Sequence, residues 1–334
     1  MIQQHGGNIY KYAKELGCEP QEIIDFSSNI NCYAVEPKLN IDNASITKYA
    51  NSDYPKLKSI IAKNYNIQTH NIALYNGATS AIYALLNRLT SKKVYLYAPL
   101  YGEYEKAALA AKKDIYKINR IEDIDAEVEK KSIVIFVNPS TPEGSFYDLE
   151  ELFLQWKAKK CTIIIDESFI EFEKHKSLKN QINDYKKLYI IQSFTKFYAC
   201  PGIRIGAILS HKKNIRSLGT PLWNLSSLDV VFLQERLCDE SFKEASHAIH
   251  QEQKKELQSI LKNSKLFHLI VESEANFILT QSSHAKEIFE HLLAHKILVR
   301  GCESFDFLDE SWIRFAVKDK NAHAKLQKAL GAFA

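Results

Sequence analysis

The segment from Leu188 to Leu209 contains a lysine whose neighbours favour unusual chemistry. Lys196 follows an apolar run and is flanked by Phe194 and Phe197 in the sequence FTKFY. Aromatic neighbours exclude water, and a desolvated amine has a lowered pKa and can form a Schiff base with an aldehyde. This pattern indicates pyridoxal phosphate (PLP) chemistry, with Lys196 binding the cofactor aldehyde. The alternative interpretation is an ordinary surface lysine in a loop.

Groups that bind phosphate surround this lysine in the sequence. Ser193 and Thr195 come just before it, and their hydroxyl groups can donate hydrogen bonds to phosphate oxygens. Most of the 44 basic residues are lysines, so an arginine in an apolar segment is informative. Three arginines meet this description: Arg204, Arg300 and Arg314. A guanidinium group can hold a carboxylate or phosphate through two parallel hydrogen bonds, which makes them candidate anion-binding residues. The alternative is a strand-edge cation that covers apolar surface.

Composition places the chain among ordinary globular proteins. Its 334 residues include 25% charged and 46% hydrophobic side chains, and a net charge of +4 does not indicate a nucleic-acid partner. We find neither a signal peptide nor a run of about 18 apolar residues, so we predict no membrane partner. Six scattered cysteines without a CxxC pair favour a reducing, cytoplasmic location. His247 and His250 have helical spacing but lack the acidic partner of a metalloprotease, so we expect a solvated helix face and no metal.

Short apolar runs alternate with helical patterns through most of the chain. Continuous apolar strands separated by helices predict an α/β architecture whose mostly parallel sheet is covered on both faces. Ligands of such sheets bind at the carboxyl ends of the strands, where Tyr101, Asp166 and Lys196 are expected. The predicted strands are 72–74, 94–97, 114–118, 133–137, 161–165, 188–191 and 203–209.

Asp166, Tyr101 and the segment 76–80 each suit a different part of a bound PLP molecule. Asp166 directly follows an apolar run, and a buried carboxylate there needs a partner, which a pyridinium nitrogen would supply. A helix N-cap or a loop carboxylate is the alternative. Tyr101 can stack on the cofactor ring or pack in the core. The sequence NGATS at 76–80 opens a helix after a glycine turn, and the free N–H groups of such a helix start bind phosphate.

The C-terminal part has a different pattern and predicts a compact α+β lobe. We expect strands at 267–271, 276–279, 297–300 and 312–317 and helices at 285–294 and 322–329. The chain is therefore divided into an N-terminal segment that joins the small domain, 1–40, a large domain, 41–244, and a small domain, 245–334. Within the large domain, a helix is expected at 49–66.

Taken in order, these residues resemble the fold-type I PLP enzymes of the histidinol-phosphate aminotransferase group. The block Ser-x-Thr-Lys…Pro-Gly-x-Arg that ends at Arg204 is highly specific for that group. The segments HGGN and SSNIN and the sequence Asp-Glu-Ser-Phe indicate its threonine-phosphate decarboxylase branch, because the aminotransferases usually carry tyrosine at the position of Phe169. The resemblance implies a large domain with a mostly parallel seven-stranded sheet, a small α+β domain, and a homodimer with shared active sites.

The resemblance also implies roles for individual residues. Lys196 would bind the PLP aldehyde, Asp166 would pair with the pyridine nitrogen, and Tyr101 would stack on the ring. The cofactor phosphate would be held by Ala78, Thr79, Ser193, Thr195, Arg204 and, from the partner subunit, Tyr49. The substrate would be bound by Arg314 at its carboxylate, with Asn29 nearby, and at its phosphate by His5, Asn8 and Arg300.

The sequence departs from the pattern of the group where that pattern has Asn-Pro-x-Gly. It reads Thr141-Pro-Glu-Gly here, so the Thr141 hydroxyl would replace the asparagine that bonds the ring hydroxyl. We expect decarboxylation of L-threonine phosphate or L-serine phosphate to aminopropanol phosphate or ethanolamine phosphate, the former serving cobalamin biosynthesis. The alternative is an aminotransferase that acts on histidinol phosphate or a related phosphorylated amine.

Overall fold

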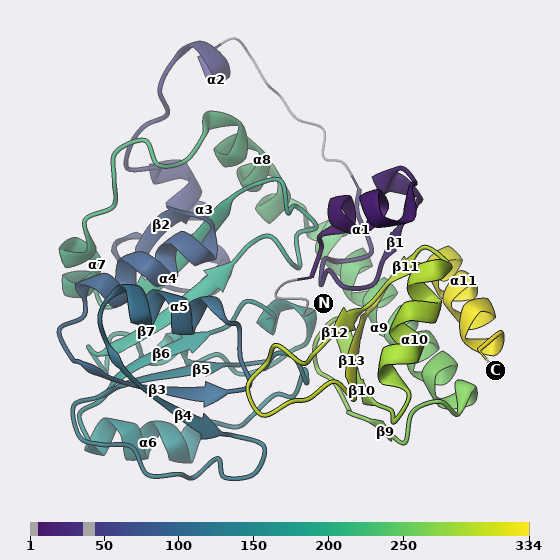
Figure 1. Cartoon of the computed structure of the whole chain (residues 1–334). Coiled ribbons are helices and arrows are strands. Elements are labelled where there is room, and N and C mark those ends of the chain that lie inside the picture. The colour runs from purple at the N-terminus through teal and green to yellow at the C-terminus, as the bar shows by residue number, and fades with distance from the viewer. Residues whose placement is uncertain (1–5, 36–43, 334) are drawn as a thin grey trace.

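A computed structural model describes residues 6–35 and 44–333, and its main element is a seven-stranded sheet (Figure 1). Five neighbouring strands run parallel, while β8 is antiparallel to both of its neighbours, β7 and β2. The predicted mostly parallel sheet is therefore confirmed. Across the sheet the strands are β2 (Ile72–Asn76), β8 (Ile205–Ser210), β7 (Leu188–Ser193), β6 (Thr162–Asp166), β5 (Ile133–Val137), β3 (Lys93–Ala98) and β4 (Asp114–Asn119).

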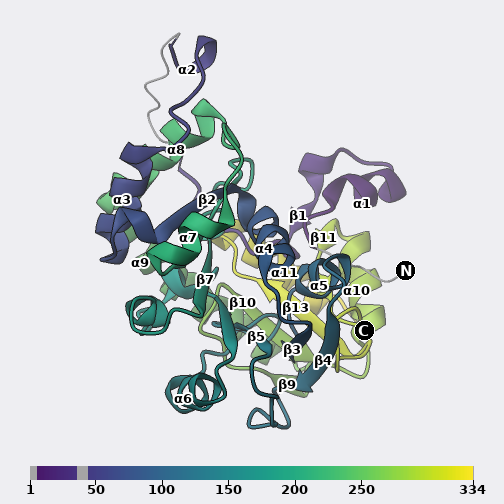
Figure 2. The same cartoon turned by 90° about the vertical axis from the view of Figure 1, so that its left-hand side faces the viewer.

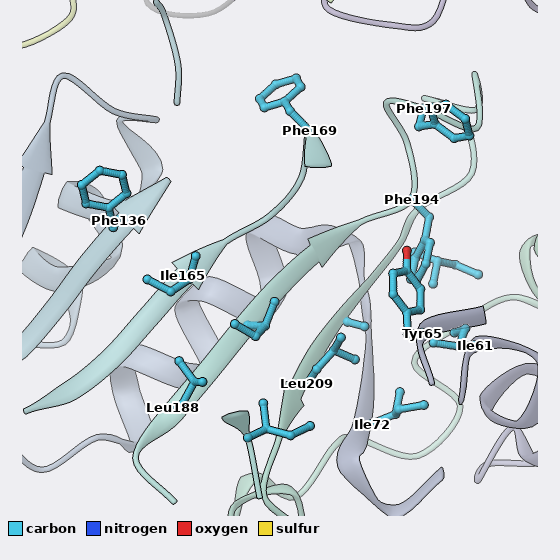
Figure 3. Packing of buried hydrophobic residues seen from close by; sticks show 14 of the residues in the cluster. Ile61, Tyr65, Ile72, Phe136, Ile165, Phe169, Leu188, Phe194, Phe197 and Leu209 are labelled. Atoms are coloured by element: carbon cyan, nitrogen blue, oxygen red, sulfur yellow. The ribbon is translucent and has the colours of Figure 1, made fainter. Parts of the chain in front are cut away.

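Helices cover both faces of this sheet because its inner strands are apolar on both sides, as in the sequence IVIFV of β5. One face packs on α3 (Pro55–Tyr65), α6 (Glu150–Ala158) and α8 (Ser227–Cys238). The other face packs on α4 (Gly77–Arg88), α5 (Glu103–Ala110) and α7 (Lys212–Leu218). Figure 3 shows the first face, where Ile165, Leu188 and Leu209 project side by side from their strands.

A second, four-stranded antiparallel sheet is built from the C-terminal third of the chain. Its strands, in spatial order, are β12 (Arg300–Gly301), β13 (Trp312–Ala316), β10 (Phe277–Gln281) and β9 (Leu269–Ile270). Three helices share a separate core with it: α9 (Glu240–Ser264), α10 (Ala285–Ala294) and α11 (Lys320–Gly331). Phe242 of α9 packs in the core of the large sheet and Leu257 in the smaller core, so a boundary at residue 245 falls within one continuous helix.

The N-terminal segment attaches to the smaller core. β1 (Ile24–Asp25) pairs in parallel with β11 (Ile297–Leu298), and Tyr12 of α1 (Ile9–Leu16) packs edge-on against Phe289 of α10. Both views place α1 beside the C-terminal helices, whereas the short α2 (Ala44–Thr47) lies far away, near α8 (Figures 1 and 2). Within the described ranges, no helix combines the length and apolar character needed to span a bilayer.

Two expectations about helices and strands, and one about a buried histidine, were wrong in detail. The helix expected from residue 49 begins at Pro55, because Tyr54 has a left-handed backbone (φ 49°) and proline suits the first helical position. The strand expected at 297–300 is split into β11 and β12, which join different sheets. His250, expected on a solvated face, is 1% exposed and packs against Phe172, 5.1 Å between ring centres.

Candidate active site

Side chains from both sheets line a cavity of about 260 Å³. It lies at the carboxyl ends of the parallel strands of the large sheet. The end of β2 and the start of the antiparallel β8 lie at the same edge of the sheet. The loop after β1 and the segment between β12 and β13 bound its other side. Twelve of the predicted site residues line this cavity: Asn29, Ala78, Thr79, Tyr101, Thr141, Asp166, Ser193, Thr195, Lys196, Arg204, Arg300 and Arg314.

Lys196 follows β7, and its amine is partly desolvated. The flanking Phe194 and Phe197 are each 1% exposed, as the aromatic sequence indicated. Burial and, to a smaller extent, the positive charges of Arg314 and Arg204 lower the pKa of Lys196 to about 8. More of this amine is therefore unprotonated near neutral pH than in an ordinary lysine, which is what attack on an aldehyde requires.

Asp166 is the last residue of β6 and is 4% exposed. The Tyr104 hydroxyl donates to its Oδ2 at 2.6 Å, and the Ser168 N–H donates to its Oδ1 at 2.9 Å. Burial raises the pKa of Asp166, so a cationic ligand group in the cavity would favour its ionised form. Sequence reasoning missed Tyr104. Its position in the first turn of α5, directly after the predicted Tyr101, was the available signal; the Tyr104 N–H donates to the Tyr101 carbonyl at 3.1 Å.

The start of α4 forms a cradle that suits a phosphate. Gly77 has a left-handed backbone (φ 78°), and a Cβ there would lie 2.8 Å from Nη2 of Arg204. A Cβ on Gly206 of β8 would collide with the backbone of Ala78. Only glycine at these two positions lets the Arg204 guanidinium and β8 approach the free N–H groups at the helix start. The positive end of the helix dipole adds to the attraction for an anion.

Hydroxyl groups complete this cradle. Ser193 and Thr195 hydrogen-bond to each other at 2.9 Å, and Thr79 and Tyr101 do so at 3.3 Å. All four residues line the cavity. Thr79 belongs to α4, and Ser193 pairs with Gly206, which packs against the backbone of Ala78, so these hydroxyl groups lie near the start of α4. The arrangement offers hydroxyl donors and a guanidinium to an anion of phosphate size.

Two arginines of the smaller sheet face the cavity as a cross-strand pair. Arg300 of β12 stands directly opposite Arg314 of β13, and the two are 2% and 5% exposed. Arg314 donates to the Thr141 hydroxyl at 3.0 Å and to the Ser27 carbonyl at 3.1 Å, while its Nε is buried without a partner in the described chain. Burial lowers the pKa of Arg314 to about 10. A buried guanidinium with only neutral acceptors indicates that an anionic ligand belongs here.

Two further residues contact Arg300, and two of the described residues predicted for the site, Asn8 and Tyr49, do not line the cavity. Arg300 donates to Ser304 at 2.7 Å and lies over the Phe305 ring at 5.2 Å, two neighbours that sequence reasoning did not identify. The described chain offers no hydrogen-bond partner to Oδ1 of Asn29. Of the other residues predicted for the site, Asn8 accepts a hydrogen bond from the Lys11 N–H and caps α1, and the Tyr49 side chain is exposed. His5 lies outside the described residues.

The cavity fits PLP group by group. The lysine amine suits its aldehyde, the buried Asp166 carboxylate suits its pyridine nitrogen, and the cradle at α4 suits its phosphate. These matches, on a mostly parallel sheet with a second α+β sheet beside it, define the class of fold-type I PLP enzymes.

Comparison with known proteins supports the same class. The sequence pattern of the family "Aminotransferase class I and II" matches residues 21–333, and the chain belongs to this family. It is 31% identical to an adenosylcobalamin biosynthesis bifunctional protein of Leptospira interrogans, with 97% of the chain covering 40% of that longer protein. It is 25% identical to the threonine-phosphate decarboxylase of Salmonella typhimurium, covering 98% of the chain and 95% of the relative.

Solved structures agree on the fold. The histidinol-phosphate aminotransferase of Clostridium acetobutylicum superimposes with a TM-score of 0.82 at 29% identity, covering 92% of this chain and 97% of that one. The chain is therefore a PLP-dependent enzyme of the aminotransferase class I and II type. The role of each cavity residue remains a prediction.

The lowered pKa of Lys196 predicts how the apoprotein takes up PLP. Because only the unprotonated amine attacks an aldehyde, the rate of capture should rise with pH and level off just above pH 8 instead of near the ordinary value of 10.5. Stopped-flow absorbance of the yellow bound cofactor would measure this profile, with Lys196→Ala as the control without capture. A rate that keeps rising to pH 10 would contradict the assignment.

Proposed function

We propose that this chain decarboxylates an O-phospho-L-amino acid, either L-threonine phosphate or L-serine phosphate. The carboxylate leaves as carbon dioxide, a proton takes its place at Cα, and the product is aminopropanol phosphate or ethanolamine phosphate. The observation that carries the proposal is the cross-strand pair of buried arginines, because two guanidinium groups in one cavity suit a substrate with both a carboxylate and a phosphate. The similarity to a threonine-phosphate decarboxylase supports the same reaction.

The residues of the chain would divide the work as follows. Arg314 binds the substrate carboxylate, and Arg300, held by Ser304, binds the phosphate at the other end. When bound, PLP supplies an electron sink for the substrate α-carbon. Holding the substrate at both ends fixes its rotation about the N–Cα bond, and this rotation decides which bond to Cα breaks. The Lys196 amine, with its pKa near 8, then returns a proton to Cα.

Transamination of histidinol phosphate or a related phosphorylated amine is the second candidate. The similarity to a histidinol-phosphate aminotransferase at 29% identity favours it. The two reactions would use the same lysine, aspartate and arginines, and they differ in whether a carboxylate or a hydrogen leaves Cα. The relative named for adenosylcobalamin biosynthesis supports a role in making cobalamin, which would need L-threonine phosphate as the substrate. If the substrate is L-serine phosphate, the enzyme would serve another pathway. A cytoplasmic location also remains a prediction.

We further propose that the working unit is a homodimer with shared active sites. Apolar side chains gather on the surface at α2 and the segment before α8, where Ile46, Tyr49 and Leu222 are 69%, 79% and 67% exposed. Tyr49 stacks on Trp223 at 4.5 Å between ring centres, which holds the tyrosine on this surface. An exposed apolar patch of this kind is typical of a protein interface, and a second copy would bring Tyr49 to the cofactor phosphate.

A product assay tests the reaction. Purified protein with PLP should release one carbon dioxide per L-threonine phosphate or L-serine phosphate consumed, regaining its yellow absorbance after each turnover, and Lys196→Ala should release none. The faster substrate identifies the preferred one. Bleaching of the yellow colour without carbon dioxide would instead establish the aminotransferase.

Arg314→Ala tests carboxylate binding. Losing a charged hydrogen bond should raise the KM for the phospho-amino acid by about ten- to a hundredfold. Affinity for PLP, measured by absorbance titration, should stay within about twofold. The exposed Arg216→Ala on α7 is the matched control. Loss of cofactor binding in Arg314→Ala would show that the residue serves the PLP site instead.

Mixing two variants, each of which should lack a complete PLP site, tests the shared sites. In a heterodimer of Lys196→Ala and Tyr49→Ala, one site has both its own Lys196 and the Tyr49 of the partner chain. If Tyr49 acts across the interface, co-refolding at a one-to-one ratio should restore about a quarter of the wild-type PLP sites, counted by absorbance at limiting cofactor. No recovery, or a chain that sediments at 38.3 kDa, would refute the proposal.

A further inference from the structure

Arg120 and Glu143 form an ion pair that is almost completely buried. Nε and Nη2 of Arg120 donate to the two carboxylate oxygens of Glu143, each at 2.6 Å, and the residues are 2% and 4% exposed. Burial alone would raise the pKa of Glu143, but the charge and hydrogen bonds of Arg120 overcome this effect and lower it. Neither residue lines the cavity, so the pair does not touch a ligand there.

The pair fastens the segment after β5 to the strand next to it. Arg120 also donates from Nη1 to the Tyr97 carbonyl of β3 at 2.6 Å and from Nη2 to the Thr141 carbonyl at 3.2 Å. The Tyr147 hydroxyl donates to Glu143 at 3.1 Å. The Thr141 carbonyl is thus held by a residue that does not itself line the cavity. Thr141 and Glu143 both belong to the sequence Thr-Pro-Glu-Gly, in which the chain departs from the pattern of the group.

The Thr141 side chain carries this constraint into the cavity. Its hydroxyl accepts the hydrogen bond from Nη1 of Arg314, so one residue is held by Arg120 through its backbone and holds Arg314 through its side chain. Because the hydroxyl accepts from Arg314, its own hydrogen remains available for a further acceptor. The hydrogen bonds of Arg314 in the described chain go only to the neutral oxygens of Thr141 and Ser27, and its guanidinium also lies over the Phe277 ring at 4.8 Å. The Thr141 hydroxyl is therefore one of these three contacts that fix its position.

We propose that the Arg120–Glu143 pair positions Thr141 and, through it, the guanidinium group of Arg314 that selects a carboxylate-bearing ligand. Arg120 and Glu143 are positioning residues, since they act through Thr141 without touching the ligand. This inference rests on the proposed function, in which Arg314 binds the substrate carboxylate. The alternative is that the pair only stabilises the fold.

The experiment compares two ligands that cannot react because they lack an amine. D-3-Phosphoglycerate has a phosphate and a carboxylate, whereas glycerol 3-phosphate has the phosphate alone. Calorimetric titration of the PLP-loaded protein gives a dissociation constant for each, and their ratio reports the carboxylate contact separately from the phosphate contact. Arg314→Ala sets the ratio expected when the contact is lost.

The variants separate positioning from folding. Glu143→Gln leaves a buried arginine charge without its partner and can unfold the chain, whereas Arg120→Met combined with Glu143→Met removes both charges, a change that buried ion pairs often tolerate. The matched control is Glu129→Gln, which breaks the exposed pair with Lys93 of β3. Circular dichroism and the unfolding midpoint identify the folded variants.

The inference predicts that the double variant folds and that its dissociation constant for glycerol 3-phosphate stays within about twofold of wild type. The ratio of the two dissociation constants, which reports the preference for D-3-phosphoglycerate, should fall about tenfold, as in Arg314→Ala. Glu129→Gln should keep the full preference. A folded double variant that also keeps it would overturn the inference while leaving the proposed function intact. Wild-type protein that binds both ligands equally would refute the carboxylate role of Arg314, and the inference with it.

Discussion

An excess of positive charge around the cavity, including the buried Arg300 and Arg314, is the constraint on which the site depends. Of the charged side chains that line the cavity in the described chain, Lys196, Arg204, Arg300 and Arg314 are basic, and Asp166 is acidic. Removing a charge from water is costly, so a cavity lined by four basic side chains and one acidic side chain favours ligands with several negative groups. The same desolvation lowers the pKa of Lys196 and raises that of Asp166. One environment therefore favours both an unprotonated lysine amine and the binding of anions.

The large sheet supplies most of this arrangement because parallel strands end at one edge. Asp166 ends β6, Ser193 ends β7, and Arg204 directly precedes the antiparallel β8, whose start lies beside the end of β7. The smaller sheet adds the opposed Arg300 and Arg314 from outside this edge. The cavity forms only where the two sheets meet, so its chemistry depends on the way the long α9 connects the two cores.

Several parts of the fold and site were predictable because they depend on local patterns. Apolar runs located the strands of the large sheet, and the aromatic neighbours of Lys196 indicated its desolvation. The glycine turn at Gly77 indicated the start of α4. The strand expected at 297–300 was not predictable in detail, since its division between two sheets depends on partners far away in the sequence. His250 was misjudged because helical spacing does not show which face packs on Phe172.

The sequence by itself determined the type of sheet, and it showed which lysine and which anion-binding groups to propose for the site, because each follows from a short run of residues. Only the tertiary structure decided how these groups meet. Arg300 and Arg314 become a pair through strand register, Tyr104 reaches Asp166 from α5, and Arg120 pairs with Glu143 across 23 residues of chain. Such contacts depend on packing between distant segments, and no local pattern specifies them.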